Sequence, residues 1–415
     1  DGPAFVERLD FGPPPADLTP ARRVLAERLL AYLHAAAGVS YYKALVPPRL
    51  ELAATGLDAG AARFLGELYR EGLGEFAHRN ALDLAPRLRF EGAAGSLAPI
   101  NVDLPPRALV PVGGGKDSLV TVELLRAAGV PLTLFAVNPK GPIPATIAAS
   151  GLEAITVQRR LDPALFALNA AGAFNGHVPI TAIVALAALV AAAWHGFDRV
   201  VMANERSADF GNFDDGGVNH QWSKSSAFEA LLRHELARAI SPDLDWFSLL
   251  RPLAELGVAE RFARTTRYDA TFSSCNRNFH LDRAGPAGRW CRDCPKCRFV
   301  FLVLAPFMDR ARLLAIFGGD MLDDASQVEG FAELAGLAGH KPFECVGETA
   351  EAAACLVVLA ERAEWRDSAV VARLAPRLAG PLAGRRDELR AVFAAARRPQ
   401  GTGFVPAALR ACLER

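Results

Sequence analysis

RALVPVGGGKDS, residues 107–118, is the stretch that decides the fold of this chain. Its first part, 108–112, is a short apolar run of strand length, and a helical pattern follows over residues 117–128. Three consecutive glycines between them let backbone N–H groups turn toward one point, where the positive end of the helix also lies. This arrangement predicts an anion cradle for a phosphate or pyrophosphate. Its residues are Gly113, Gly114, Gly115, Lys116, Asp117 and Ser118.

The residues behind the glycines distinguish this loop from its alternatives. A flexible turn would explain the glycines but not the Lys, Asp and Ser that follow them, and Lys is rare here, with six lysines against forty arginines. Two standard phosphate-binding loops fail on spacing, because one needs G-x-x-x-x-G-K-[ST] and the other needs G-x-G-x-x-G. The sequence therefore indicates a nucleotide-phosphate loop of another kind.

The segments around the loop alternate between strand and helix. Apolar runs of strand type cover residues 131–137 and 199–203, and a long helical pattern covers residues 178–195. Such alternation predicts an α/β fold with a doubly wound, mostly parallel sheet. Ligands of these sheets bind beyond the carboxyl ends of the strands, so the ends of the apolar runs are the places to search.

Polar residues gather after the strand predicted at 199–203. Asn204 comes directly after it and is a candidate nucleotide contact. Because Mg²⁺ takes oxygen ligands and bridges phosphates, Glu205 and Asp209 are the predicted magnesium ligands. Lys224, later in the same polar segment, would offset the charge that develops on an α-phosphate in a transition state. A solvated polar loop is the alternative.

Four of the seven cysteines fall within 23 residues. Cys275, Cys291, Cys294 and Cys297 have the pattern C-x15-C-x2-C-x2-C, in which thiolates can surround one tetrahedral zinc ion. The sequence predicts a structural zinc knuckle, with an iron–sulfur cluster and a redox or catalytic thiol as the alternatives. The other three cysteines lie in helical patterns and are expected in the core.

Composition limits the kinds of partner. The chain has 415 residues, a formal net charge of zero and 51% hydrophobic residues, which exclude a disordered protein and a strong general attraction to nucleic acid or anionic membranes. No stretch is long and apolar enough to span a bilayer, no secretory signal is visible, and an odd number of cysteines suits a reducing compartment. We therefore expect a cytoplasmic protein that acts on a small molecule without nucleic-acid or membrane partners. The oligomeric state is not predicted.

Three regions are expected along the chain. Residues 1–105 predict an α+β unit with two helices, one near 20–37, where Thr19-Pro20 is typical of an N-cap and a first helical turn, and one near 61–78. The segment Ser40-Tyr41-Tyr42-Lys43 between them predicts either a half-buried turn or a wall of the substrate pocket. Residues 106–320 carry the nucleotide loop and the cysteine knuckle at 275–297. Residues 321–415 are rich in Ala, Leu and Arg and predict a helical C-terminal region.

The glycine loop resembles that of the PP-loop ATP pyrophosphatases, whose signature is Ser-Gly-Gly-x-Asp-Ser after the first strand. The match runs from Gly113 to Ser118, with Gly113 in place of the usual Ser. The resemblance implies that ATP binds with its β,γ-diphosphate on the loop while a nucleophile attacks the α-phosphorus, yielding AMP and pyrophosphate. It also implies adenine or ribose contacts near Asn138. Some enzymes of this kind, such as 7-cyano-7-deazaguanine synthase, carry a similar four-cysteine knuckle.

A narrower resemblance covers most of the chain and is to the ATP-dependent UDP-N-acetylmuramoyl-L-alanyl-L-glutamate epimerases. It rests on the segments 40–43, 113–118, 203–207, 218–224, 273–277 and 294–299. It implies that a terminal L-Glu is converted to D-Glu in peptidoglycan precursor synthesis, with ATP and Mg²⁺ consumed to adenylate a carboxyl group and make the α-proton removable. The rival functions are another AMP-forming PP-loop enzyme (an amide ligase, a 7-cyano-7-deazaguanine-synthase-like enzyme or a tRNA-modifying enzyme) and a non-catalytic ATP-binding zinc protein.

An epimerase of this kind needs a base beside the α-carbon. His220 is the first candidate, because imidazole titrates nearest to neutral pH, and Asp214, Asp215 and Lys224 follow. Cys275 becomes a credible base if the zinc is absent, or if it is held instead by the other three cysteines of the knuckle with His280.

Overall fold

The computed structural model describes residues 3–52, 55–211, 218–279, 288–339, 342, 344, 346–380 and 383–414. The candidate bases Asp214 and Asp215 lie outside the described residues, as does His280.

A six-stranded, mostly parallel sheet forms the centre of the molecule, with the strand order β1-β6-β5-β4-β7-β8. Its neighbouring strands are parallel except β1, which pairs antiparallel with β6 at one edge. The order reverses between β4 and β7, which is the kind of switch point where α/β sheets bind ligands. The mixed α/β fold with a mostly parallel sheet is confirmed. The strands are β1 (Arg8–Asp10), β4 (Ala108–Pro111), β5 (Leu132–Val137), β6 (Ala154–Arg160), β7 (Arg199–Met202) and β8 (Asp245–Ser248).

Helices cover both faces of this sheet, so its central strands are buried on both sides. On β4, Ala108 and Val110 join one buried cluster, whereas Leu109 joins the other, and all three side chains are fully buried. This division follows from the two-residue period of a strand. It also explains why the central strands have apolar runs rather than alternating polar residues.

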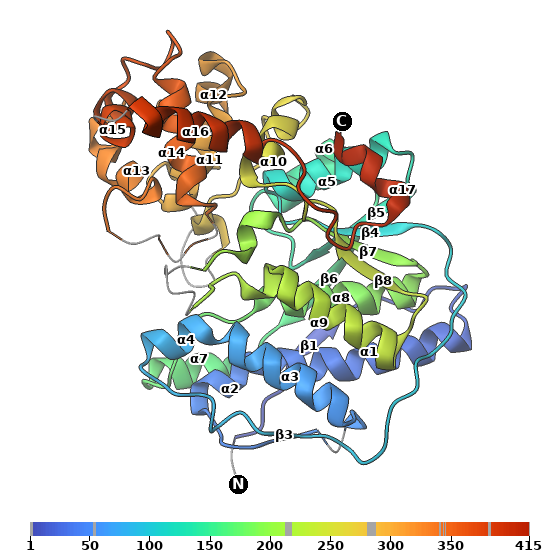
Figure 1. Cartoon of the computed structure of the whole chain (residues 1–415). Helices are drawn as coiled ribbons and strands as arrows, with labels where there is room; N and C mark the ends of the chain where they lie inside the picture. The colour runs from blue at the N-terminus through green and yellow to red at the C-terminus, as the bar shows by residue number, and fades with distance from the viewer. Residues whose placement is uncertain are drawn as a thin grey trace.

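The N-terminal helices pack together with α8 and α9 against one face of the sheet (Figure 1). Thr19 caps α1 by accepting a hydrogen bond from Arg22 N at 3.3 Å, and Pro20 occupies its first turn, as the sequence predicts. The elements of this layer are α1 (Pro20–Ala37), α2 (Val39–Leu45), α3 (Ala59–Gly72), α4 (Gly74–Arg79), α7 (Pro163–Ala170), α8 (Ile180–His195) and α9 (Ser226–Glu235), with the small sheet of β2 (Leu50–Glu51) and β3 (Phe90–Glu91).

The helix predicted at 61–78 is two helices in the structure. The backbone leaves helical geometry at Leu73, between α3 and α4. Close by, a Cβ at Gly72 would stand 2.7 Å from Pro179, so only glycine lets the end of α3 approach the start of α8. The break begins a new helix that carries Glu75 in its first turn.

The first hundred residues share their core with the α/β region. Residues of α1 and α3 belong to the same buried cluster as Leu109 of β4 and Phe135 of β5. The strand β1 also adds directly to the main sheet. The three-region division of the chain remains a prediction, because shared packing does not by itself define where one domain ends.

Helices dominate the C-terminal region, as predicted, and form the orange-to-red part of Figure 1. The last turns return to the α/β region, where Arg261 donates a hydrogen bond to the carbonyl of Leu413. The helices of the second layer and of this region are α5 (Lys116–Ala127), α6 (Ile143–Ser150), α10 (Glu255–Ala263), α11 (Pro295–Leu304), α12 (Arg310–Phe317), α13 (Val328–Leu334), α14 (Thr349–Leu359), α15 (Ala369–Ala379), α16 (Ala383–Ala396) and α17 (Ala407–Arg410).

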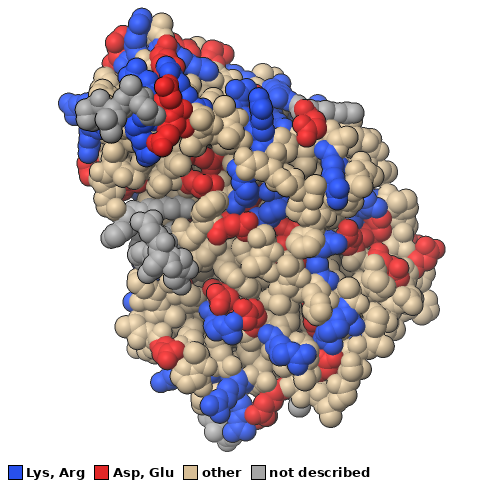
Figure 2. Space-filling view, viewed as in Figure 1, with Lys and Arg blue, Asp and Glu red and all other residues tan. Residues whose placement is uncertain are grey.

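On the face that Figure 2 shows, Lys and Arg are interspersed with Asp and Glu among larger areas of other residues. None of the described helices, the apolar α8 included, is long and apolar enough to cross a membrane.

Candidate functional site

The glycine loop leaves β4 and enters α5 with a backbone that requires glycine at one position and is closely covered at the next. Gly114 has φ +78°, and a Cβ there would lie 2.8 Å from Pro142 Cγ. A Cβ on Gly115 would lie 2.7 Å from Ser274 Oγ. A side chain at Gly114 would be strained by the left-handed backbone and would clash with Pro142, whereas one at Gly115 would displace the Ser274 hydroxyl.

A cavity of about 640 Å³ opens above this loop. Its floor consists of the carboxyl ends of β4, β5 and β7 with the residues that follow them, which is the position expected for a ligand of a parallel sheet. Polar side chains from several separate segments of the chain line it. They are Asp117, Ser118, His177, Thr181, Asn204, His220, Gln221, Ser223, Lys224, Ser273, Ser274, Asn276 and Lys296.

Lys116 of the loop is directed away from the cavity. Its side chain is 1% exposed, does not line the cavity, and donates hydrogen bonds to Asp117 and to Glu255 of α10. Burial lowers the pKa of Lys116, but the carboxylates of Asp117, Glu255 and Glu205 outweigh burial and raise it. Lys116 is therefore a fully paired cation beneath the loop.

The carboxylates near the loop differ in their protonation. Burial raises the pKa of Glu205 to about 7, with further upward contributions from the charges of Glu255 and Asp117. For Asp117, burial acts upward too, but the charges of Lys116 and Lys296 prevail and lower the pKa. Asp117 is thus an ionised carboxylate on the cavity wall, and Glu205 is a buried one that titrates near neutral pH. Carboxylates in these places fit a divalent cation that accompanies a phosphate.

Asp209, predicted to bind magnesium, and Asn138, placed near adenine or ribose contacts, have other partners in the structure. Asp209 accepts a hydrogen bond from the backbone of Ser226 at 2.5 Å and lies 3.6 Å from Arg251 Nη1, and it is not among the residues that line the cavity. Asn138 has φ +46°, and its amide bridges to the backbone of Arg159 on β6 through bonds of 2.8 and 2.7 Å. Its neighbour Val137 lines the cavity instead. Asn204 lines the cavity and donates to Ser248 Oγ at 3.1 Å.

His220 lies on the cavity wall within a group that the sequence did not predict. Its Nδ1 is hydrogen-bonded to Glu75 of α4, and its ring centroid lies 4.3 Å from that of His177. Glu75 also accepts a bond from Arg79 Nε at 2.6 Å. We call Glu75, His177 and His220 the histidine cluster. A carboxylate bonded to one imidazole nitrogen fixes the tautomer, leaving the other nitrogen to accept a proton.

The electrostatics of the histidine cluster keep His177 neutral. Burial lowers the pKa of His177 to about 4, helped by the charges of His220, Lys224 and Lys43 and opposed by that of Glu75. The pKa of Glu75 is lowered as well, because its contacts with His220, His177 and Arg79 outweigh burial. The ligand atoms of the cluster lie within 4.8 Å of one another, so these residues could also hold a metal ion.

The segment Ser40-Tyr41-Tyr42-Lys43 supports this wall from behind. Lys43 is 8% exposed, and its Nζ donates to the side chain of Asn175 and, at 3.2 Å, to the carbonyl of Gly176, directly before His177. Tyr41 accepts a bond from Asp162 N at 3.1 Å. None of the four residues lines the cavity, so the segment acts on the wall through its neighbours.

The four predicted cysteines come together as one group, which we call the cysteine cluster. The sulfur atoms of Cys275, Cys291, Cys294 and Cys297 all lie within 4.8 Å of one another, which is the arrangement of a four-thiolate zinc site. Backbone N–H groups point at the sulfurs, including Cys294 N to Cys291 Sγ at 3.3 Å and Cys297 N to Cys294 Sγ at 3.4 Å. Hydrogen bonds from Cys294 and Cys297 lower the pKa of Cys275, whereas contacts with Cys275 and Cys294 raise that of Cys297.

The cysteine cluster touches the glycine loop through the segment that precedes Cys275. Ser273 N donates to the carbonyl of Gly114 at 3.0 Å, and Ser273 Oγ accepts from Cys275 N at 3.1 Å. Ser274 covers Gly115, as its close approach to that residue shows. A metal in the cluster would therefore fix one side of the cavity.

Four site residues were missed by sequence reasoning, namely Glu75, His177, Glu255 and Lys296. For Lys296 a signal existed, because it is one of only six lysines and lies between two cysteines of the knuckle. The other three had none, since an isolated Glu or His within an ordinary segment has no pattern that separates it from a surface residue.

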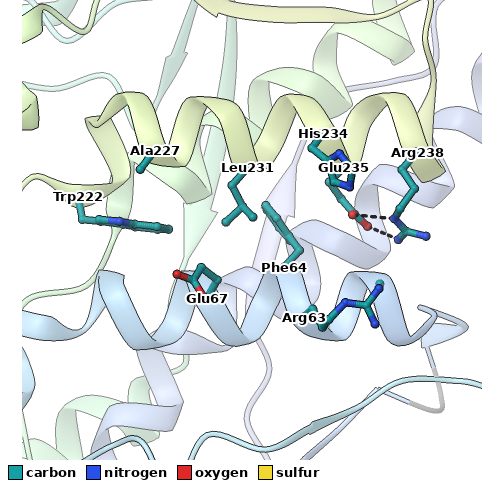
Figure 3. Close-up of a pocket in the computed structure, with 10 residues that line it drawn as sticks. Arg63, Phe64, Glu67, Trp222, Ala227, Leu231, His234, Glu235 and Arg238 are labelled. Carbon is teal, nitrogen blue, oxygen red and sulfur yellow. Dashed lines mark hydrogen bonds and ion pairs between the residues drawn. The ribbon is translucent and has the colours of Figure 1, made fainter.

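A second, smaller cavity of about 300 Å³ lies between α3 and α9 (Figure 3). Phe64 and Leu231 face each other across it, and Arg238 at one end pairs with Glu235 and with Asp58 at 2.8 Å. Arg238 is thus already paired with two carboxylates, and the cavity lies apart from the carboxyl ends of the strands.

Comparison with known proteins places the whole arrangement in one group. The family model described as MurL N-terminal domain matches residues 1–249, and the one described as MurL C-terminal domain matches residues 271–388. Three curated relatives are named UDP-N-acetyl-alpha-D-muramoyl-L-alanyl-L-glutamate epimerase. The protein of Xanthomonas oryzae pv. oryzae is 48% identical over 90% of this chain and 83% of its own length. Those of a Micromonospora species and of Salinispora tropica are 50% and 49% identical, each over 87% of this chain and over 80% and 79% of their own lengths.

Proposed function

Because the chain belongs to the MurL family of UDP-N-acetyl-alpha-D-muramoyl-L-alanyl-L-glutamate epimerases, we propose that it converts the terminal L-Glu of UDP-N-acetylmuramoyl-L-Ala-L-Glu to D-Glu. In this proposal the reaction consumes ATP with Mg²⁺, yields AMP and pyrophosphate, and serves peptidoglycan precursor synthesis. One observation supports it most strongly. A single cavity joins a glycine loop suited to a diphosphate with a carboxylate-oriented histidine.

The two halves of the cavity correspond to the two chemical needs of the reaction. The α-proton of a terminal Glu is hard to remove while the adjacent carboxylate is charged, because deprotonation would add a second negative charge beside the first. In the first step, a carboxylate oxygen attacks the α-phosphorus of ATP, and the bond from that phosphorus to the bridging oxygen breaks. Pyrophosphate departs from the glycine loop with the positive end of α5 behind it. The carboxyl group is now an acyl-adenylate whose carbonyl can accept electrons.

His220 acts in the second step. Its Nδ1 is bonded to Glu75, which leaves Nε2 as the nitrogen that takes the α-proton while the C–H electrons move into the adenylate carbonyl. The electron pair then returns from the enolate to the α-carbon, which takes a proton from solvent on its opposite face, and His220 gives its proton up to water. Water finally attacks the carbonyl, the bond to AMP breaks, and the epimerised carboxylate is released. Lys224, on the same cavity, offsets charge on the α-phosphate.

The metal ions have separate roles in the proposal. Mg²⁺ would neutralise phosphate oxygens, and Asp117 on the cavity wall with the adjacent buried Glu205 offers carboxylates for it. Asp209 was the other predicted ligand, and its place beside Ser226 and Arg251 favours a role in holding the loop. Zinc in the cysteine cluster would be structural.

The test is turnover in deuterated water. With ATP, Mg²⁺ and UDP-N-acetylmuramoyl-L-Ala-L-Glu we expect AMP, pyrophosphate, a D-Glu product and one deuterium at its α-carbon. Release of ADP, or epimerisation without ATP, would contradict the adenylation step. AMP formation that requires a tRNA or an amine instead of this substrate would favour the rival PP-loop reactions.

A further inference from the structure

Lys296 is a buried cation whose charge is only partly answered by the protein. It lies in the first turn of α11, between Cys294 and Cys297, with 7% of its surface exposed. Its ammonium group lies 3.9 Å from Glu255 Oε1, at the outer limit of an ion pair. Its Nζ also lies 5.7 Å from the centre of the Phe299 ring. Among the residues that the structure describes, no hydrogen bond from Lys296 Nζ is present.

Lys116 provides the contrast, because it is buried as well, with 1% of its surface exposed, and its ammonium group is hydrogen-bonded to two carboxylates. It donates to Asp117 and to Glu255 Oε2, the same carboxylate whose other oxygen faces Lys296. A buried charge is costly unless it is hydrogen-bonded to a partner of opposite sign. Lys116, the lysine of the glycine loop, is thus already hydrogen-bonded to carboxylates. Lys296, the lysine of the cysteine knuckle, can still donate hydrogen bonds to a ligand.

The surroundings of Lys296 indicate the kind of partner it would take. It lines the same cavity as Gly113, Gly115 and Ser118 of the glycine loop. The loop's backbone and the end of α5 already favour an anion there. An ammonium group on the adjoining wall adds a point charge that matches a diphosphate rather than a nucleoside.

Resting on the proposed function, we propose that Lys296 binds the β,γ-diphosphate of ATP and that the cysteine cluster sets its position. The cluster determines where α11 begins, since Cys294 caps this helix and Cys297 lies one residue after Lys296. Glu344 reinforces the geometry by accepting a bond from Lys296 N at 3.1 Å and one from Asn276 Nδ2 at 2.9 Å. In this proposal the cysteine knuckle fixes the position of Lys296, the cation that binds the phosphates.

Direct binding of ATP with Mg²⁺, AMP and pyrophosphate to the full chain tests this assignment. Lys296→Met keeps the length of the side chain and removes its charge. We expect the Kd for ATP and for pyrophosphate to rise about 10-fold to 100-fold, as for loss of a charged hydrogen bond, while the Kd for AMP stays near that of the unchanged chain. Lys296→Arg should retain part of the affinity.

Arg292→Gln is the matched control, because Arg292 is an exposed cation of the same knuckle, bonded to the carbonyl of Gly318 and absent from the cavity lining. Its ATP affinity should be unchanged. Lys296→Met protein that keeps full ATP affinity would overturn the inference, as would an equal weakening of ATP and AMP. If the unchanged chain binds no ATP at all, the proposed function fails as well, so the two failures are distinguishable.

Discussion

The cysteine cluster and the histidine cluster are equally compact, but they differ in where their residues come from, in their hydrogen-bond partners and in their access to the cavity. Each gathers potential metal ligands within 4.8 Å of one another. The cysteines come mainly from one short segment, are surrounded by backbone donors, and lie behind the glycine loop. The histidine cluster comes from three distant segments, satisfies itself by hydrogen bonds, and faces the cavity. Ligand spacing in space therefore does not reveal a role, whereas the partners of the ligands and their access to the cavity do.

Loss of the cysteine cluster should have the largest effect. In Cys294→Ser/Cys297→Ser protein we expect bound zinc to fall from about one per chain to none, with the Tm lowered by about 10 °C or more, because metal-binding free energy contributes to folding. Elemental analysis and thermal unfolding measure both quantities.

The control for this prediction is Cys355→Ala, which removes a buried cysteine of α14 outside the cluster. It should keep its zinc. Glu75→Gln protein should keep its zinc too. If the unchanged chain bound a second metal ion and this variant lost it, the histidine cluster would be a metal centre like the cysteine cluster.

Removal of the proposed base should give the next largest effect. His220→Asn should lower the rate of α-proton exchange with deuterated solvent by about 10²-fold to 10⁴-fold, since that is the usual contribution of a general base. Binding of ATP should persist, because His220 lies on the wall that the glycine loop does not form. Undiminished exchange in this variant would remove His220 from the mechanism.

The carboxylate behind His220 should matter less than the histidine itself. For Glu75→Gln we expect exchange to fall about 10-fold to 100-fold, because Glu75 acts by orienting His220 rather than by touching the substrate. A positioning role also predicts a lower apparent pKa in the pH–rate profile, since the carboxylate stabilises the charged imidazole. A profile that does not move would indicate a merely structural role for Glu75.

His177 should produce the smallest effect, which appears in stability as a function of pH. Its pKa is about 4 in the folded chain and near 6.5 when unfolded, so the unfolded state binds more protons between these values. Stability from this group is present above pH 6.5 and is lost as the pH falls toward 4, by at most about 3 kcal/mol. Urea unfolding of wild-type and His177→Gln protein across this window measures it. The free energy of unfolding of the wild-type protein should fall relative to that of His177→Gln as the pH drops from 6.5 toward 4. A difference between the two free energies that stays constant with pH would contradict the lowered pKa.

Local sequence patterns predicted the cysteine cluster and the glycine loop because their chemistry is contiguous. Three glycines followed by a helix start, or cysteines two residues apart, restrict the backbone so strongly that the neighbours in sequence are also neighbours in space. The α/β class followed in the same way from alternating apolar runs. The start of α1 was predictable for the same reason, because its N-cap Thr19 and its first-turn Pro20 are adjacent in the chain.

The histidine cluster could be predicted only in part. The sequence singled out His220 because imidazole titrates near neutral pH, but its partner Glu75 is 145 residues away and lies in a helix that the pattern merged with the one before it. The candidates Asp214 and Asp215 fall outside the described residues, so their roles stay predictions. Asn138 and Asp209 show a different limit, since each bonds to the backbone of a segment packed beside it, at Arg159 and Ser226.

By itself the sequence determined where the backbone must bend for an anion, which cysteines share a site, and which segments are buried in a parallel sheet. Each of these depends on residues close together in the chain. Only the tertiary structure decided the long-range contacts of the site. Lys116 is hydrogen-bonded to Glu255, Lys296 rather than Lys116 lines the cavity, and Glu75 is hydrogen-bonded to His220. Long-range pairing of charges depends on how the layers pack, and no local pattern encodes which of several lysines or carboxylates will meet.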